Sequence, residues 1–280
     1  MSSSSLSAAR RRFAEIVARQ DDEINLAEAA LLIAAEEYPS LDVNLYLWRL
    51  DSFGDIARER AAESRDPIDI VTALNAALFD QLGFRGNRES YYDPRNSYLN
   101  EVIDRRIGIP ITLAVVYIEV AKRIGFPIKG VGMPFHFIAK HEGEIGEVFI
   151  DPFNGGRVLG PAGCDALITQ MSGGKLDLRP EHLEAVTSKQ ILTRMLSNLL
   201  GVYSAGDHRR ALSAIDFILM INPDSTVHIR DRGLLLAAIG NQTTAILELE
   251  KYLDLDPRAS DADTIREQIK SLRQSQARLN

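Results

Sequence analysis

The chain has 280 residues, of which 45% are hydrophobic and 25% are charged, an ordinary composition for a globular protein with a packed core. Its formal charge of −7 argues against a nucleic-acid partner, because a basic binding surface would have to act against the field of the whole protein. Residues 1–12 contain no apolar stretch of the length that a signal peptide or a membrane span needs, so we expect a cytoplasmic protein that does not bind a membrane.

Cysteine and histidine, the usual ligands of zinc, are scarce in this sequence. Cys164 is the only cysteine, which rules out an intrachain disulfide and a zinc site built from several cysteines. None of the five histidines pairs with another at the i, i+4 spacing of a helical metal site. We therefore predict no metal and no cofactor, and a fold stabilised by burial.

The first part of the chain has the periodicity of α-helices. Apolar residues recur at helical spacing from Phe13 to Ala57, with breaks that predict three helices. Asp66 before Pro67 is typical of a helix N-cap and a first helical residue, and Gly83 is typical of a residue that ends a helix. Residues 1–83 are thus predicted to form a helical region that packs on the core.

The pattern of residue types changes at Phe84. Residues 84–108 are polar and aromatic with little periodicity, which predicts a structured loop. Pro110 then begins an apolar segment with helical spacing, and Gly125 follows its end. This segment is predicted to be a central and mostly buried helix.

Two short apolar runs come next, Ile128–Ala139 and Val148–Asp151, separated by the charged residues 142–147. Short apolar runs bounded by Gly or Pro predict a β-hairpin. One helix backed by a small antiparallel sheet results, which gives residues 84–186 the expected form of an α+β core.

The last part of the chain repeats with a period of 34 residues. The matching pairs are Gly206 with Gly240, Ala211 with Ala245, and Pro223 with Pro257. This is the period of tetratricopeptide repeats, in which small residues let antiparallel helices approach and proline ends the second helix. A closing amphipathic helix with Ile265, Ile269 and Leu272 is predicted to cap the array. Residues 187–280 are therefore predicted to be an all-α repeat domain.

Four motifs together resemble a known family. They are Tyr91–Pro94, Asn96–Asn100, Arg106–Ala114 and Asp151–Gly156. With His136 between the last two, their order is that of a transglutaminase-like (papain-like) core. The chain resembles the bacterial transglutaminase-like family named after an invasion-gene regulator, which joins such a core to tetratricopeptide repeats. The resemblance covers nearly the whole chain and implies an α+β fold with a helical N-terminal region and C-terminal repeats.

The resemblance also assigns roles to residues. In active enzymes of this kind a Gly-x-Cys, with an alanine four residues after the cysteine, starts the central helix, and two strands supply a histidine and an aspartate before proline. Gly108, Ala114, His136 and Asp151 match, which implies a retained catalytic His–Asp pair. Pro110 stands in the place of the cysteine. Proline supplies no nucleophile, so the usual acyl-transfer route is closed, although it is a good first residue for the helix.

Thr112 and Cys164 are the candidates for a replacement nucleophile. Thr112 lies about 200° round the helix from Pro110, and its alternative interpretation is a small core residue. Cys164 would have to fold back over the cleft, and a lone cysteine is more often a buried apolar residue. Phe135 stands where the resemblance implies a glycine, and it is the candidate to narrow or plug the cleft.

Further polar and aromatic residues are candidates to line that cleft, although such residues also anchor turns and loops. They are Asn87, Tyr91, Tyr92, Asn96, Asn100, Arg105, Arg106 and Asn154, which join Pro110, Thr112 and Phe135.

Three functions stay open at this point. The favoured one is a non-enzymatic, regulatory binding protein, a pseudoenzyme whose partner is another protein or a peptide. The alternative is a hydrolase or acyl-transferase of altered mechanism, using His136 and Asp151 with water, Thr112 or Cys164. The third is a structural adaptor whose core is a relic.

Overall fold

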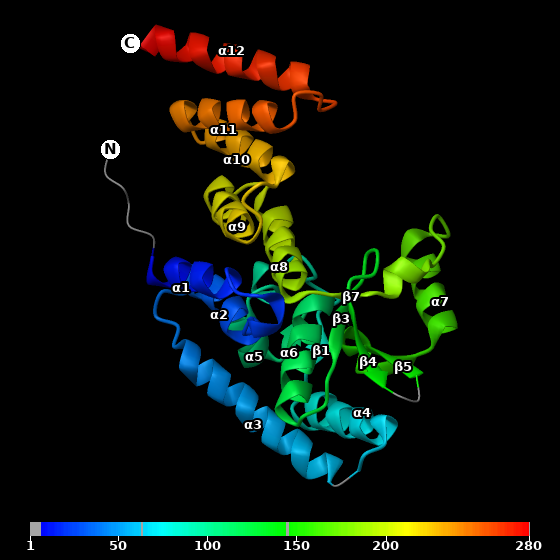
Figure 1. Cartoon of the computed structure of the whole chain (residues 1–280). Helices are drawn as coiled ribbons and strands as arrows, with labels where there is room; N and C mark the ends of the chain where they lie inside the picture. Colours follow the sequence, from blue (N-terminus) through cyan, green and yellow to red (C-terminus); the bar gives the residue numbers. More distant parts are fainter. Residues whose placement is uncertain (1–6, 63, 144–145, 280) are drawn as a thin grey trace. The chain divides into compact units, whose positions relative to one another are not determined.

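The computed structural model describes residues 7–62, 64–143 and 146–279. The serine run at the N-terminus and residues 144–145 of the predicted turn lie outside the described residues. The chain forms two compact units, Met1–Met195 and Leu196–Asn280. Figure 1 follows the elements of both units from blue to red.

Capped helices open the first unit, as the periodicity predicts. They are α1 (Ala8–Val17), α2 (Leu26–Glu37), α3 (Val43–Ala61) and α4 (Pro67–Asn75). Each begins after a side chain that accepts a backbone N–H of the first turn, and these caps are Ser7, Asn25, Asp42 and Asp66. The last helix continues into a π-helical turn, Ala76–Gln81, before Gly83 at φ +73°. Its π-helical part was not predicted.

The stretch predicted as a loop contains a helix, α5 (Leu99–Arg105), so that prediction is wrong for these residues. The helix is seven residues long, and no side chain caps its N-terminus. Both usual signals of a helix are therefore weak in the sequence. Two short strands flank the remaining loop, β1 (Arg85–Gly86) and β2 (Ile107–Gly108), and they pair in parallel.

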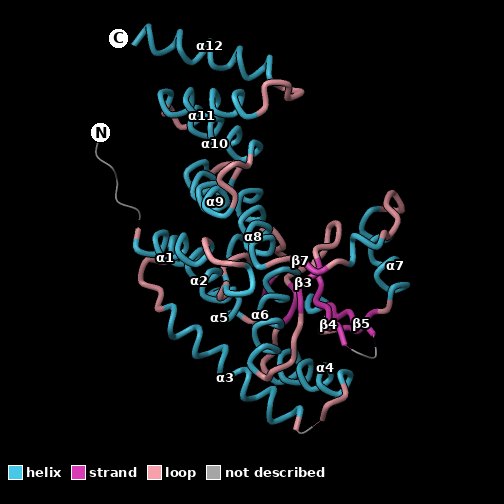
Figure 2. Tube along the Cα trace, in the orientation of Figure 1, coloured by secondary structure: helices cyan, strands magenta, loops and turns pink. Residues whose placement is uncertain are grey.

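An antiparallel sheet with the strand order β6-β5-β4-β3-β7 forms one layer of the first unit (Figure 2, magenta). Its strands are β3 (Lys129–Val131), β4 (Ile138–Gly143), β5 (Gly146–Asp151), β6 (Arg157–Leu159) and β7 (Ala185–Val186). The predicted hairpin is confirmed as β4 and β5. Its first strand is not continuous, because residues 132–137 separate β3 from β4, and neither β6 nor β7 was predicted. Helix α7 (Pro161–Ser172) follows β6.

The charged residues predicted as a turn instead extend the hairpin. Glu142 stands directly opposite Glu147, an arrangement that is unfavourable for two like charges. Lys140 compensates, because its Nζ lies 2.9 Å from a carboxylate oxygen of each glutamate. The ion pairs of Lys140 depend on the pairing of β4 with β5. The run of charged residues by itself is typical of a turn, which is why a turn was predicted.

Helix α6 (Pro110–Arg123) is the centre of the first unit, as predicted. Every residue from Pro110 to Ala121 is buried, and the helix contacts α2 and α3 as well as β3 and β4. A fully buried Val, Leu or Ile side chain contributes about 1.5–3 kcal/mol, so an apolar run of this length makes α6 the main element of the core.

The second unit continues α8 (Ser188–Tyr203) with a regular helical array. Its helices are α9 (His208–Ile221), α10 (Thr226–Ala238), α11 (Gln242–Leu255) and α12 (Ala262–Leu279). The first and last residues of α9 and α11 are 34 apart (208 to 242 and 221 to 255), which confirms the repeat. Ile265 and Ile269 of α12 are buried against the array, as predicted for a closing helix.

Small residues act differently at different places in the array. Ala211 and Ala245 are fully buried between helices. A side chain on Gly233 would place its Cβ 2.7 Å from Cδ2 of Leu249, so α10 and α11 approach too closely for one. Gly206 and Gly240 have open space around them, so the prediction that they permit close packing is wrong. Gly240 instead adopts φ +83° in a turn.

Within the described ranges, no helix combines the length and the apolar composition that a membrane span requires.

Alanine substitutions at two helical glycines should have opposite effects. Gly201→Ala should raise the free energy of unfolding by up to about 1 kcal/mol, because alanine favours a helix and the space around Gly201 is open. Gly233→Ala should lower it by about 1–3 kcal/mol, because the clash with Leu249 outweighs that gain. Chemical denaturation of the full chain measures both. Equal effects of the same sign would contradict the close approach of α10 and α11.

Candidate functional site

His136 and Asp151 are in contact at one end of the β4–β5 hairpin. His136 lies two residues before β4 and Asp151 is the last residue of β5, so the antiparallel register brings them together. Nε2 of His136 is 3.0 Å from Oδ1 of Asp151. The exposed fractions are 3% for His136 and 1% for Asp151, so the pair is closed off from solvent.

The protonation of this pair follows from its hydrogen bonds. Burial alone would raise the pKa of Asp151, but the hydrogen bond and charge of His136 and two hydrogen bonds from Asn154 outweigh it and hold that pKa below its ordinary value. With Asp151 ionised and able only to accept, Nε2 of His136 is the donor in their hydrogen bond. Nδ1 is buried and has no hydrogen-bond partner among the described residues.

Asn154 extends the pair toward the surface. Its Nδ2 donates to Oδ2 of Asp151 at 2.6 Å, and its backbone N–H donates to Oδ1 at 3.3 Å, which closes the 3-10 turn Pro152–Asn154. Arg88 in turn donates from its guanidinium to Oδ1 of Asn154. Arg88 was not predicted, because this contact joins residues that are 66 positions apart.

A tight turn presents His136. The backbone N–H of His136 donates to the carbonyl of Met133 at 3.3 Å, and Phe135, the third residue of the turn, has φ +61°. A turn with proline second and a positive φ third is a type II turn, which favours glycine at the third position. The glycine implied by the resemblance thus has a physical reason, and Phe135 is strained in its place.

Arg194 of α8 holds this turn from outside. Its Nη2 donates to the carbonyl of Met133 at 3.0 Å and to that of His136 at 2.7 Å. Arg194 was not predicted either, because it lies within residues 187–280, which were predicted to be the repeat domain. We infer that Arg194 is a positioning residue for the His136 backbone.

The ring beside His136 belongs to Phe153. The two ring centroids are 6.0 Å apart in an edge-to-face arrangement. Phe153 also leaves no space for a side chain on Gly86, where a Cβ would lie 2.6 Å from the ring. Phe135 is 58% exposed, so the prediction that it plugs a cleft is wrong.

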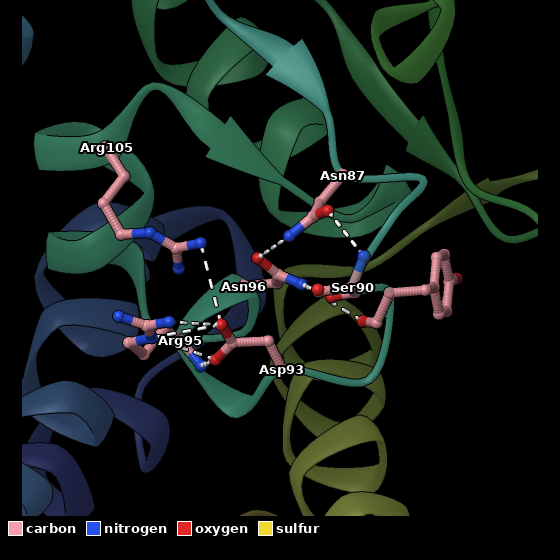
Figure 3. A network of polar contacts seen from close by, with 7 residues as sticks. Asn87, Ser90, Asp93, Arg95, Asn96 and Arg105 are labelled. Atoms are coloured by element: carbon pink, nitrogen blue, oxygen red, sulfur yellow. Dashed lines mark hydrogen bonds and ion pairs between the residues drawn. The ribbon is translucent and has the colours of Figure 1, made fainter.

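The loop that contains the tyrosines is held by buried asparagine contacts (Figure 3). Asn96 is fully buried and donates to the carbonyls of Ser90 and Tyr91, at 2.7 and 3.1 Å. Its Oδ1 accepts from Asn87 at 3.0 Å, and Asn87 also accepts the backbone N–H of Ser90. Both asparagines therefore anchor the loop through contacts with its own backbone.

The remaining cleft candidates have different surroundings. Arg106 stacks over Phe53 and Phe84, with its guanidinium carbon 4.3 and 4.8 Å from the ring centroids. Arg105 faces Asp93 at 3.8 Å (Figure 3). Asn100 is 4% exposed, and its Oδ1 has no hydrogen-bond partner in the described part of the chain.

A model of the transglutaminase-like superfamily matches residues 44–197, more than half of the chain, and a tetratricopeptide-repeat model matches residues 202–270. The chain belongs to the transglutaminase-like superfamily. The two matches follow the order of the two units, the α+β unit first and the helical array second.

Similar proteins come from bacteria and from an animal. A UPF0162 protein of Xylella fastidiosa is 41% identical over 251 residues, which cover 88% of this chain and 89% of that protein. A UPF0162 protein of Vibrio cholerae is 27% identical over 257 residues, or 90% of this chain and 93% of that protein. F-box only protein 21 of Pongo abelii is 31% identical over 201 residues, or 67% of this chain and 31% of that protein. The bacterial similarity therefore extends through both units.

At the start of α6, the position where the resemblance implies a cysteine holds Pro110, and the nearby Thr112 hydroxyl is hydrogen-bonded to the backbone. Pro110 is buried as the first helical residue. The Thr112 hydroxyl accepts the backbone N–H of Ile109 at 3.1 Å and donates to the carbonyl of Asn96 at 2.7 Å. Thr112 is fully buried, so it acts as a helix cap and a tie to the tyrosine loop.

Cys164 has the surroundings of a core residue. It is fully buried in a cluster with Val131, Phe149 and Ile168. Burial and the negative charge of Asp151 raise the pKa of its thiol to about 11, which disfavours the thiolate that a nucleophile needs. No group of three or more His, Cys, Asp or Glu side chains that could hold a metal ion occurs in the ranges that the structure describes.

Glycine usually lowers stability relative to alanine, but at Phe135 it should raise the free energy of unfolding, because the backbone there has a positive φ. Phe135→Gly should be more stable than Phe135→Ala by about 1 kcal/mol, because alanine keeps the cost of a positive φ and glycine does not. Both variants lose the same exposed ring, so their difference reports the backbone alone. Urea denaturation of the two proteins measures it, and a more stable alanine variant would contradict the turn.

Cys164 should resist labelling in the native protein. With its pKa raised to about 11 and its side chain buried, it should react with a thiol reagent at pH 8 only as the chain opens. Absorbance with Ellman's reagent should show one slow thiol in buffer and one fast thiol in guanidinium chloride. Fast native labelling would return Cys164 to the candidates for a nucleophile.

Proposed function

We propose that this protein is a non-catalytic member of the transglutaminase-like superfamily that binds another protein or a peptide. The observation that carries the proposal is the absence of an available nucleophile at the described start of α6. Pro110 replaces the cysteine, and the Thr112 hydroxyl is engaged with the backbone. Cysteine-dependent acyl transfer needs a thiolate at this helix start, and neither residue supplies one.

The helical array supports the binding part of the proposal. Tetratricopeptide-type arrays stack helix pairs into extended surfaces that commonly recognise peptides or proteins. The tetratricopeptide match and the 34-residue spacing of α9 and α11 place this chain in that class of array. A regulatory role, a cytoplasmic location and the closer kinship to the family named after an invasion-gene regulator belong to the same proposal.

The domain limits are a further part of the proposal. Residues 1–83 would form the helical support, residues 84–186 the transglutaminase-like core, and residues 187–280 the binding array.

A hydrolase of altered mechanism is the second candidate. The observation in its favour is Nδ1 of His136, a buried ring nitrogen without a hydrogen-bond partner among the described residues, in a ring whose Nε2 is held by the carboxylate of Asp151. Such a dyad is able to take a proton from water. We place it second because the pair is 3% and 1% exposed and lies against Phe153.

Two measurements on the full chain separate these functions. In the first, wild type and His136→Gln are compared for hydrolysis of p-nitrophenyl acetate and for incorporation of dansylcadaverine into casein. We expect no turnover that depends on His136. A turnover that His136→Gln abolishes, with an unchanged circular dichroism spectrum, would favour the enzyme.

The second measurement tests binding directly. The immobilised full chain is used to select peptides from a phage-displayed library of random 12-residue sequences. We expect related sequences to be enriched and to bind with dissociation constants in the micromolar range, roughly −8 kcal/mol, as for peptide modules. A library that yields no specific peptide would contradict the proposed function.

A further inference from the structure

Arginine and tyrosine side chains gather over the buried His–Asp pair, at the surface of the first unit. We call Arg88, Tyr91, Tyr92, Phe153 and Arg157 the arginine–tyrosine patch. Phe153 is its centre, since Tyr91 packs edge-to-face on it at 6.2 Å and the Arg88 guanidinium carbon lies 5.5 Å from its centroid. Tyr92 contacts Tyr91 at 5.4 Å and is 79% exposed.

Arg157 joins the patch through the sheet. It stands directly opposite Asp151 in the pairing of β5 with β6. Residues opposite each other in an antiparallel pair share one face, with Cβ atoms about 4.5–5.5 Å apart. Since Asp151 also binds Asn154, which binds Arg88, both arginines lie around the same 3-10 turn.

Both guanidinium groups are exposed and free of carboxylates. Arg88 donates to the neutral amide of Asn154 and stacks on Phe153, and neither Arg88 nor Arg157 forms an ion pair within the described residues. The carboxylate nearest to them in the pairing, Asp151, is taken up by His136 and Asn154. Two arginines on a protein of net charge −7 thus lie around one turn without an ion-pair partner among the described residues.

Part of the patch is ordered before any partner arrives. Asn96 and Asn87 fix the backbone of the tyrosine loop (Figure 3), and Asn154 and Phe153 fix the head of Arg88. Tyrosine and arginine dominate the binding energy of many interfaces, and side chains that are already ordered lose less entropy on binding. The buried His–Asp pair thereby supports this surface through Asn154 and Phe153.

We propose that the arginine–tyrosine patch binds an acidic peptide segment of a partner protein, with an Asp or Glu carboxylate between Arg88 and Arg157 and an apolar neighbour against Tyr91 and Tyr92. The planar edge of a guanidinium offers two parallel N–H donors, which fit the two oxygens of a carboxylate. The net negative charge of the protein disfavours acidic chains over much of its surface, so two arginines without ion-pair partners provide a local exception. The inference rests on the proposed function and names the partner of the transglutaminase-like unit.

The test uses the peptides selected by the full chain from the random 12-residue library. We expect enrichment of Asp or Glu next to an apolar residue. Fluorescence anisotropy then compares the best peptide on wild type, Arg88→Gln, Arg157→Gln and the matched control Arg85→Gln. Loss of one charged hydrogen bond should weaken binding by about tenfold for each of the first two variants.

The control should bind like wild type. Arg85 is exposed on β1, next to Gly86, and its side chain has no contact with Phe153 or Asn154 among the bonds described. Changing the acidic residue of the peptide to Gln should cause the same loss of affinity on wild type. It should cause no further loss on the Arg88→Gln, Arg157→Gln double variant.

Three outcomes overturn the inference. If selected peptides bind wild type and the double variant equally, the patch is not their site, although the proposed peptide binding stands. If phosphoserine in place of the acidic residue binds more than tenfold tighter, the ligand is a phosphopeptide. If no peptide is selected, the proposed function fails as well.

Discussion

The buried carboxylate of Asp151 is the contact on which the rest of the site depends. It accepts hydrogen bonds from the ring of His136 and from the side chain and backbone of Asn154, and it is 1% exposed. A buried carboxylate without such partners would be strongly destabilising, so the turn of His136 and the 3-10 turn of Asn154 are held to the end of β5. Through Asn154 the same carboxylate also orients Arg88 at the surface. The hydrogen bonds of Asp151 and Asn154 thus connect the end of β5, the turn of His136 and the loop of Arg88.

The start of α6 is likewise held by contacts with the backbone. In a transglutaminase-like enzyme the free N–H groups of this helix end stabilise a thiolate. In this protein Pro110 needs no partner for an N–H, and Thr112 caps the backbone of Ile109 while it binds the carbonyl of Asn96. Asn96 in turn fixes the loop of Tyr91. The helix start and the tyrosine loop therefore stabilise each other through Asn96.

These contacts explain how the core is stabilised with Pro110 at the start of α6. Helix α6 is buried from Pro110 to Ala121, and the sheet packs on it, so the scaffold does not require the cysteine. Several polar residues lie near the start of α6, among them Thr112 and Asn96. On the proposed function they order an exposed surface, and a rigid surface with unpaired arginines is suited to recognition.

The amino-acid sequence by itself determined the elements with strong local signals. The capped helices, the buried run after Pro110, the hairpin and the 34-residue repeat all follow from periodicity, N-caps and punctuation by Gly and Pro. Only the tertiary structure decided the short helix α5, the strands β6 and β7 and the extension of the hairpin through Glu142 and Glu147. Their stability comes from pairing and from Lys140, which local patterns do not contain. The same holds for Arg88, Phe153 and Arg194, because each acts through a contact with residues distant in the chain. The role of a side chain at such a site depends on which segments the fold brings together. The spacing of residues within one segment does not contain that information.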